Sequence, residues 1–138
     1  MPVIRRGEAR DLEAVAAIQA ASPEAARWSV ADYLRCDLRV AGCGGRVAGF
    51  LVSRVVAEGE CELLTLAVAP EFRRQGIGGG LVNALVEEFR GAIWLEVRES
   101  NNAARKFYGF MGFQEIGRRV GYYDAPAEAA IVMKFHSC

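Results

Sequence analysis

One segment of the sequence has the residue types and the spacing to bind a charged ligand through its backbone. It lies between two stretches of regular periodicity and consists of Arg73, Arg74, Gln75, Gly76, Ile77, Gly78, Gly79 and Gly80. Glycines before a helix let successive N–H groups point into one concavity at the positive end of the helix, where phosphate oxygens bind. The segment therefore predicts a phosphate-binding loop, with a glycine-rich turn that binds no ligand as the alternative.

Two common nucleotide-binding motifs do not fit this segment. A Walker loop needs Gly-Lys followed by Ser or Thr, whereas here the glycines run into Leu81. A Rossmann fingerprint needs a third glycine at that position, directly after its strand. Both motifs are therefore excluded.

The elements that position this loop can be predicted from periodicity. Residues 3–6 are expected to form a strand, and Asp11 is expected to cap a helix that Pro23 stops. Ser29 and Asp32, three residues apart, fit a capping box for a second short helix. We therefore expect two helices before the central strands of the sheet.

Extended stretches surround the loop. Residues 47–56 and 61–68 are rich in β-formers and are separated by a turn at 57–60, which predicts an antiparallel hairpin at the centre of a sheet. After the loop we expect an amphipathic helix whose apolar face holds Leu81, Val82, Leu85, Val86 and Phe89. The apolar run 92–97 is typical of a strand covered on both faces, so the helix is expected to connect two parallel strands.

The last third of the chain predicts a helix and a hairpin. Ser100, Asn101 and Asn102 can cap a helix that ends at Gly112, and residues 114–123 and 129–135 are two extended runs. The fold class is therefore α/β, with a mixed, mostly antiparallel sheet, one parallel strand pair and about four helices. We expect residues 1–138 to form a single domain.

The composition limits the class of protein. Hydrophobic residues make up 52% of the 138 residues, and 17 Lys and Arg balance 17 Asp and Glu, which excludes a disordered chain and a sequence-independent nucleic-acid binder. The N-terminal residues lack a secretory pattern, and no apolar stretch approaches the about 18 residues of a membrane span. We expect a cytoplasmic protein without a membrane or direct nucleic-acid partner.

The cysteines do not form a metal site or a disulfide framework. Cys36, Cys43, Cys61 and Cys138 contain no Cys-x-x-Cys pair, and His136 does not complete a zinc-binding spacing with them. We therefore expect reduced thiols and no metal.

Several motifs, taken in order, resemble the GNAT family of acetyl-CoA-dependent N-acetyltransferases. Arg73, Gly76 and Gly78 match the family's (Gln/Arg)-x-x-Gly-x-(Gly/Ala) motif. Residues 101–108 followed by Gly-Phe at 112–113 look like its Asn-x-x-Ala…Tyr…Gly-Phe signature. The resemblance implies the GNAT fold, in which the sheet is splayed at its central parallel strand pair.

A closer resemblance is to the RimI-type ribosomal-protein-alanine N-acetyltransferases. It rests on Leu-Glu-Val-Arg at 95–98 and on Arg-Arg-Val-Gly-Tyr-Tyr at 118–123, and it covers residues 61–135. The chain departs from that pattern at Gly79 and Gly80, because the subfamily has a basic residue after the second motif glycine. This departure affects the expected affinity for the cofactor.

The resemblance implies an acetyl-CoA site built mostly from backbone. The strand before the loop is expected to carry a bulge, and an N–H from Val68 is expected to stabilise the oxyanion of the thioester carbonyl. The amides of residues 74–79 are expected to hold the pyrophosphate. The implied cofactor-binding residues are Leu66, Ala67, Val68, Arg73, Arg74, Gln75, Gly76, Ile77, Gly78, Gly79 and Asn101.

The resemblance also implies two catalytic residues. Glu96 matches the glutamate that takes the proton of the amine, and Tyr108 matches the tyrosine that protonates the leaving thiolate. The alternatives are that Glu96 is paired with Arg98 or another cation and that Tyr108 only packs in the core. Because Phe107 and Met111 share one helical face, Tyr108 is expected to point away from that core face.

The acceptor groove is implied to lie beside Tyr122 and Tyr123, although aromatic residues of a hairpin also pack simply to cover it. Arg118 and Arg119 are expected to be a solvated pair on a strand. The resemblance thus implies direct acetyl transfer from acetyl-CoA to a protein N-terminal α-amine, such as that of a ribosomal protein, by a monomer or weak dimer.

Two other functions stay open from the sequence. In the first, the protein acetylates a small-molecule amine or a lysine. In the second, the domain is a non-catalytic acetyl-CoA sensor or scaffold. A panel of peptide, polyamine and aminoglycoside acceptors separates these functions.

Overall fold

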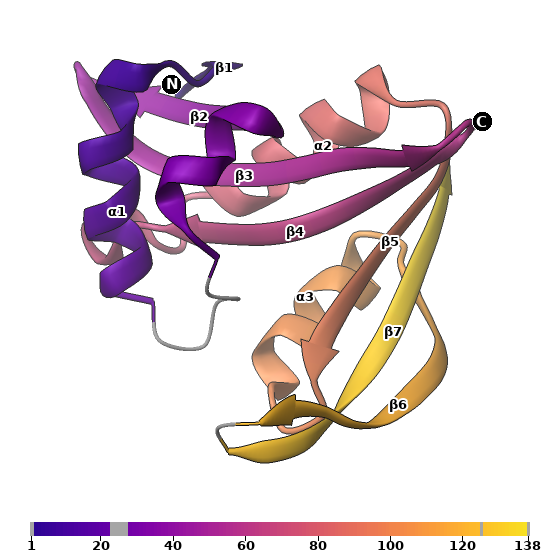
Figure 1. The fold of residues 1–138 in the computed structure, drawn as a ribbon. Coiled ribbons are helices and arrows are strands. Elements are labelled where there is room, and N and C mark those ends of the chain that lie inside the picture. The colour runs from indigo at the N-terminus through magenta and orange to yellow at the C-terminus, as the bar shows by residue number, and fades with distance from the viewer. Residues whose placement is uncertain (1, 23–27, 125, 138) are drawn as a thin grey trace. The chain divides into compact units, whose positions relative to one another are not determined.

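The computed structural model describes residues 2–22, 28–124 and 126–137. Figure 1 labels the strands and the α-helices. In chain order the elements are β1 (Val3–Arg6), η1 (Ala9–Asp11), α1 (Leu12–Ala20), η2 (Val30–Arg35), β2 (Asp37–Cys43), β3 (Arg46–Ala57), β4 (Glu60–Val68), η3 (Pro70–Phe72), α2 (Ile77–Glu88), β5 (Gly91–Arg98), α3 (Asn102–Phe110), β6 (Gln114–Asp124) and β7 (Ala127–Ser137). The η elements are 3₁₀-helices.

The seven strands form one mixed sheet in the order β1-β2-β3-β4-β5-β7-β6. Strands β4 and β5 are parallel, with Glu60 opposite Ala92 and Glu62 opposite Trp94, and α2 connects them. The pairs β1–β2, β2–β3, β5–β7 and β6–β7 are antiparallel. The predicted fold class is therefore confirmed, and the predicted hairpin, β3 and β4, takes the third and fourth places in the sheet.

The chain divides into two compact units. The first contains Met1–Arg54 and Leu63–Glu88, and the second contains Val55–Glu62 and Phe89–Cys138. Whether residues 1–138 form a single domain and whether the sheet is splayed both depend on how these units are related. Both therefore stay predictions.

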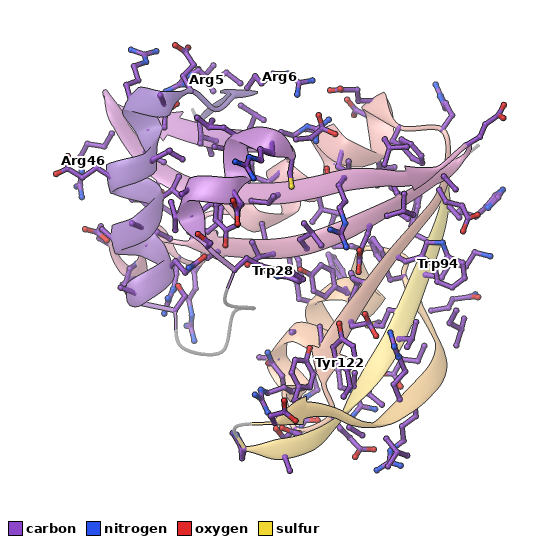
Figure 2. The ribbon with its side chains drawn as sticks, viewed as in Figure 1. Arg5, Arg6, Trp28, Arg46, Trp94 and Tyr122 are labelled. Atoms are coloured by element: carbon purple, nitrogen blue, oxygen red, sulfur yellow. The ribbon has the colours of Figure 1, made fainter. Side chains whose placement is uncertain are left out.

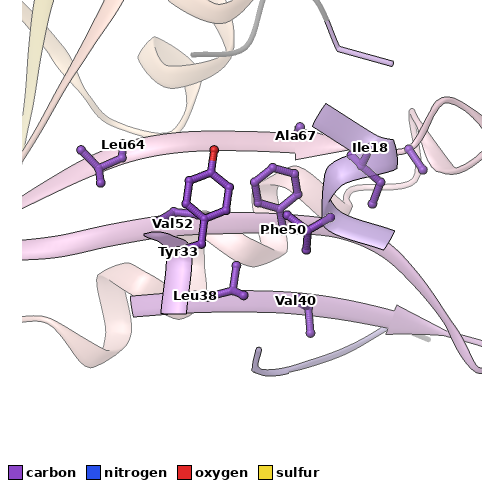
Figure 3. Packing of buried hydrophobic residues seen from close by; sticks show 10 residues of the cluster. Ile18, Tyr33, Leu38, Val40, Phe50, Val52, Leu64 and Ala67 are labelled. Carbon is purple, nitrogen blue, oxygen red and sulfur yellow. The ribbon is translucent and has the colours of Figure 1, made fainter. Parts of the chain in front are cut away.

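The first unit has its core between helices α1 and η2 and strands β2, β3 and β4, as Figure 3 shows. Val15 and Ile18 of α1 pack there, and the Tyr33 and Phe50 rings lie 5.9 Å apart. Strand β2 was not predicted, because its four consecutive buried residues, 38–41, do not alternate. One of them is Arg39, whose guanidinium pairs with Glu88 at 2.8 Å.

Two predicted helix caps are wrong. The Asp11 side chain does not cap α1; its carboxylate accepts two hydrogen bonds of 2.8 Å from the Arg5 guanidinium and one from the Glu8 N–H. Ser29 makes no side-chain cap, and the helix that follows it is the 3₁₀-helix η2. A bidentate arginine is a stronger partner for the buried Asp11 carboxylate than a helix N-terminus. Pro23 lies outside the described residues.

The second unit has its core on one face of β5. Ile93 and Leu95 are buried on one face, whereas Trp94 and Glu96 on the other face are half-buried, so β5 is covered more completely on the Ile93 face. The core includes aromatic residues of α3, β7 and the turn between α3 and β6. None of the helices in residues 2–22, 28–124 and 126–137 is long and apolar enough to cross a membrane.

Candidate active site

The glycine segment lies in the first unit, where β4 ends and α2 begins. Ile77 is 2% exposed and anchors the start of the helix, whereas Arg74 and Gly76 are exposed and have left-handed φ angles of 65° and 78°. The Gly80 N–H donates to the Gly76 carbonyl at 3.0 Å, which closes the first helical turn. The N–H groups of residues 77–79 come before the first intrahelical hydrogen bond, so no carbonyl of the helix can accept from them. The loop therefore presents the backbone donors that a phosphate needs.

The Arg73 side chain holds this loop in place. Its guanidinium donates to the Val68 carbonyl at 3.1 Å, to the Ala21 carbonyl at 3.3 Å and to the Ser22 hydroxyl at 3.2 Å. Arg73 thus ties the end of β4 to the end of α1. Its predicted contact with the cofactor stays a prediction.

Gly49 of β3 is a functional residue that the sequence analysis missed. A Cβ atom at this position would lie 3.0 Å from the Ala67 carbonyl oxygen and 3.2 Å from the Ile77 side chain. The glycine therefore lets β3 approach the end of β4 and the first turn of α2. A glycine inside a strand pattern is a known signal of such a close approach.

Strand β4 has an irregular alternation in front of the loop. Leu64, Ala67 and Ala69 belong to one core cluster, although regular alternation places Leu64 on the face opposite to Ala67. The Thr65 hydroxyl between them is buried without a hydrogen-bond partner in the described part of the chain. This irregularity is of the kind that a bulge produces.

The second unit holds a pocket of about 250 Å³ that contains Glu96. The Glu96 carboxylate is 14% exposed, and its Oε2 accepts a hydrogen bond of 2.7 Å from Nη1 of Arg119. Three carboxylates, one arginine and apolar side chains line the pocket; they are Val56, Glu60, Glu62, Trp94, Leu95, Glu96, Arg119 and Val132. Figure 2 labels Trp94 on this part of the sheet.

The two predicted acceptor-site tyrosines lie beside Glu96. The Arg119 guanidinium lies 4.6 Å from the centroid of the Tyr122 ring, and this ring packs edge to face on Tyr123 at 5.0 Å. Figure 2 labels Tyr122. The Tyr123 hydroxyl donates to the main-chain carbonyl of Glu96 at 3.3 Å. Burial, and then the negative charge of Glu96, raise the pKa of Tyr122. Burial, followed by neighbouring charges, raises the pKa of Tyr123 to about 12.

Arg118 and Arg119 are exposed on β6, as expected, but each also forms an ion pair. Arg118 forms an ion pair with Glu99 at 2.7 Å, and Arg119 forms one with Glu96 at 2.7 Å. Arg98 pairs with Glu128 at 3.3 Å. Glu96 is therefore paired with a cation from another strand, which spacing along the sequence does not show.

Tyr108 is part of the core of the second unit. Tyr108 is 7% exposed, and the centroid of its ring lies 5.1 Å from that of Phe107 and 5.5 Å from that of Phe113. The expected orientation away from the core is wrong, because the turn after α3 places Phe113 against the ring. Burial raises the pKa of the Tyr108 phenol, which keeps its proton in place.

Tyr108 and Glu96 lie on different sides of β5. Phe113 packs on Phe135 at 5.4 Å, and Phe135 is opposite Ile93, so this aromatic group lies on the Ile93 face. Glu96 belongs to the other face by alternation. The structure therefore brings Glu96, Tyr122 and Tyr123 together. Of the predicted catalytic and acceptor-site residues, Glu96 lines the pocket, and Tyr108, Tyr122 and Tyr123 do not.

Asn101 caps helix α3, as predicted. Its Oδ1 accepts a hydrogen bond of 3.1 Å from the Ala104 N–H. The amide nitrogen of the same side chain remains a donor. No group of three or more metal-ligating side chains occurs in the parts of the chain that the structure describes.

Comparison with known proteins identifies the class. Residues 8–113 match the Acetyltransferase (GNAT) family, so the chain belongs to this family. Among curated proteins, it is similar to the [Ribosomal protein bS18]-alanine N-acetyltransferase of Escherichia coli K12, with 41% identity over 95 residues. The match covers 64% of each chain, so it spans just under two thirds of that relative's length.

Solved structures agree with this assignment. The crystal structure of the ribosomal-protein-S18-alanine N-acetyltransferase from Escherichia coli has a TM-score of 0.81 and 32% identity, and it matches 99% of this chain and 94% of that chain. Arabidopsis thaliana NAA60, solved in complex with acetyl-CoA, has a TM-score of 0.85 at 20% identity over 99% and 98% of the two chains. At that identity the second likeness shows the fold alone.

Proposed function

We propose that this protein transfers acetyl from acetyl-CoA to the N-terminal α-amine of a protein, as its ribosomal-protein-alanine relatives are named for doing. The observation that carries the proposal is the partly buried Glu96 carboxylate, which lies in a pocket with Tyr122 beside it. A base and an aromatic wall on one sheet face are what an amine acceptor requires.

The glycine loop fits acetyl-CoA as a substrate. The amides of residues 77–79 and the positive end of α2 suit the pyrophosphate, and a side chain at Gly76 is disfavoured by its φ of 78°. The irregular alternation of β4 supports a main-chain N–H of Val68 as the donor to the thioester oxygen. Acetyl-CoA supplies the activated acetyl group.

Glu96 acts as the base. An α-amine with a pKa of about 7.7–8.0 is roughly a tenth neutral at pH 7, whereas a lysine with a pKa near 10.4 is less than about a thousandth neutral. The neutral amine nitrogen attacks the carbonyl carbon, and its surplus proton passes to the Glu96 carboxylate. A modest base is sufficient for an N-terminus.

Tyr108 acts as the acid. As the new C–N bond forms, the C–S bond breaks, and the leaving thiolate takes the proton of the Tyr108 phenol. The raised pKa of Tyr108 keeps the phenol protonated until that step.

The acceptor peptide is proposed to lie along Tyr122 and Tyr123, and its source to be a ribosomal protein. The protein acts as a monomer or weak dimer in the cytoplasm. Asn101 contributes the amide nitrogen of its side chain to the cofactor.

Acceptor panels test this proposal. The protein is incubated with acetyl-CoA and with an Ala-initiated peptide, the same peptide with a blocked N-terminus and an internal lysine, a polyamine or an aminoglycoside. Mass spectrometry of the products is expected to find acetylation of the free α-amine above all others. Preferred acetylation of lysine or of the small amines, or no turnover of any acceptor despite CoA binding, contradicts it.

A further inference from the structure

The Glu96 carboxylate already has a cationic partner from the protein itself. The Arg119 guanidinium reaches Glu96 Oε2 at 2.7 Å. The two partners differ in exposure, since the Arg119 side chain is 59% exposed and that of Glu96 is 14% exposed. The carboxylate is therefore fixed in the pocket, whereas its partner has room to leave.

An irregularity of β6 brings Arg119 and Tyr122 to the same carboxylate. Arg119 lies opposite Ala130 and Tyr123 opposite Glu128, so residues 120–122 face a single residue of β7. Gly121 within this bulge has a φ of 70°. In a regular strand, residues 119 and 122 point to opposite faces. The bulge turns both side chains toward Glu96, as bulges beside active sites commonly do.

Glu96 and Tyr122 together form a place for a cation. A carboxylate on one side and the face of an aromatic ring on the other attract ammonium and guanidinium groups alike. Arg119 fills this place with its own guanidinium, 4.6 Å from the centroid of the Tyr122 ring. An acceptor α-amine arrives mostly as an ammonium ion at pH 7 and needs the same carboxylate.

We propose that Arg119 competes with the acceptor's ammonium group for the Glu96 carboxylate and so weakens binding of the acceptor. The inference rests on the proposed function. While Arg119 is in place, the charges of the carboxylate and the guanidinium cancel, so the pocket does not attract an ammonium through Glu96.

The test uses Arg119→Gln, with Arg118→Gln as the matched control. Arg118 is the adjacent residue, is also exposed, and pairs with Glu99 at the same 2.7 Å distance. The control thus removes the same charge from the same strand without touching Glu96. An Arg119→Lys variant keeps the charge, and thermal unfolding confirms that each variant is folded.

Two readouts are measured with an Ala-initiated peptide. The first is KM under saturating acetyl-CoA, and the second is the dissociation constant of the peptide in the presence of CoA, which cannot acetylate it. Arg119→Gln is expected to lower both by about two- to fivefold, the range that an exposed ion pair contributes. Arg118→Gln and Arg119→Lys are expected to stay near the wild type.

An unchanged or higher dissociation constant in Arg119→Gln overturns the inference, and so does an equal fall in Arg118→Gln. A fall in kcat alone also overturns it, because it would mean that Arg119 only orients Glu96. Failure of the proposed function looks different, since the wild type would then bind the peptide without acetylating it. If no variant binds the peptide, both proposals fall.

Discussion

The glycine loop and the Glu96 pocket support ligand chemistry in different ways. The loop offers main-chain amides whose positions depend on backbone angles, on the close approach at Gly49 and on the Arg73 side chain. The pocket offers side chains that strands β3, β4, β5, β6 and β7 bring together, with Arg119 of β6 paired to Glu96 of β5. Backbone chemistry of this kind leaves a pattern in the sequence, whereas the pairing of distant side chains leaves none.

The largest expected effect comes from Glu96→Gln, which removes the base and leaves the shape of the pocket intact. We expect kcat for an Ala-initiated peptide to fall by about 100-fold, at the lower end of general-base contributions, because the acceptor amine is easily deprotonated. Affinity for CoA should not change. Glu99→Gln is the control, since it also breaks an exposed glutamate–arginine pair, and equal activity losses in both variants would contradict the role of Glu96.

A change in the loop should act on cofactor affinity instead. Gly76→Ala forces a side chain into a backbone with φ of 78°, which costs about 1–2 kcal/mol. We expect CoA to bind about five- to thirtyfold more weakly, as measured by isothermal titration. Gly45→Ala, in a turn with φ of 82°, carries the same strain away from the loop and should leave CoA binding unchanged. Equal weakening by both variants would refute the assignment of the loop.

Tyr108→Phe is expected to have a smaller effect on turnover. A thiol with a pKa of about 8.5 is a good leaving group, so we expect a loss of only about five- to tenfold in kcat. Tyr33→Phe removes another buried hydroxyl, in the first unit, and should leave kcat unchanged. Burst kinetics of thiol release measure the step, and an unaltered rate in Tyr108→Phe would show that this tyrosine only packs.

Asp11 tests whether a carboxylate–arginine pair outside the pocket is purely structural. Hydrogen bonds from the Arg5 guanidinium are the main cause of the lowered pKa of Asp11. The pKa of Asp11 in the folded state therefore lies below the unfolded value of about 3.9. The pair thus contributes stability above that pH, and this contribution is lost as the pH falls toward the folded-state pKa. Asp11→Asn should lower the free energy of unfolding by about 1 kcal/mol at pH 7 and by progressively less below a pH of about 4, without a change in kcat. Denaturant unfolding across this pH range measures it, and a constant difference would contradict the assignment.

Local signals account for the part of the fold that could be predicted from the sequence. The hairpin of β3 and β4, the amphipathic helix α2 and the Asn101 cap each follow from neighbouring residues. Strand β2 could not be predicted, because Arg39 is buried by a partner 49 positions away, Glu88. Asp11 has its partner six residues before it, in a strand rather than in its own helix.

The candidate site divides in the same way. The glycine segment and Glu96 could be found from motifs, because their chemistry depends on local sequence. The pairing of Arg119 with Glu96 could not, since it depends on the register of β6 with β7 and on the bulge at Gly121. The sequence left the burial of Tyr108 only as an alternative, because Phe113 beyond the end of α3 completes its surroundings.

Isothermal titration of CoA into the wild-type protein and the Glu96→Gln variant tests the central claim most directly. The account predicts that both bind CoA with the same affinity and that only the wild type then acetylates an Ala-initiated peptide. Absence of CoA binding by the folded wild type up to millimolar concentration would contradict the account.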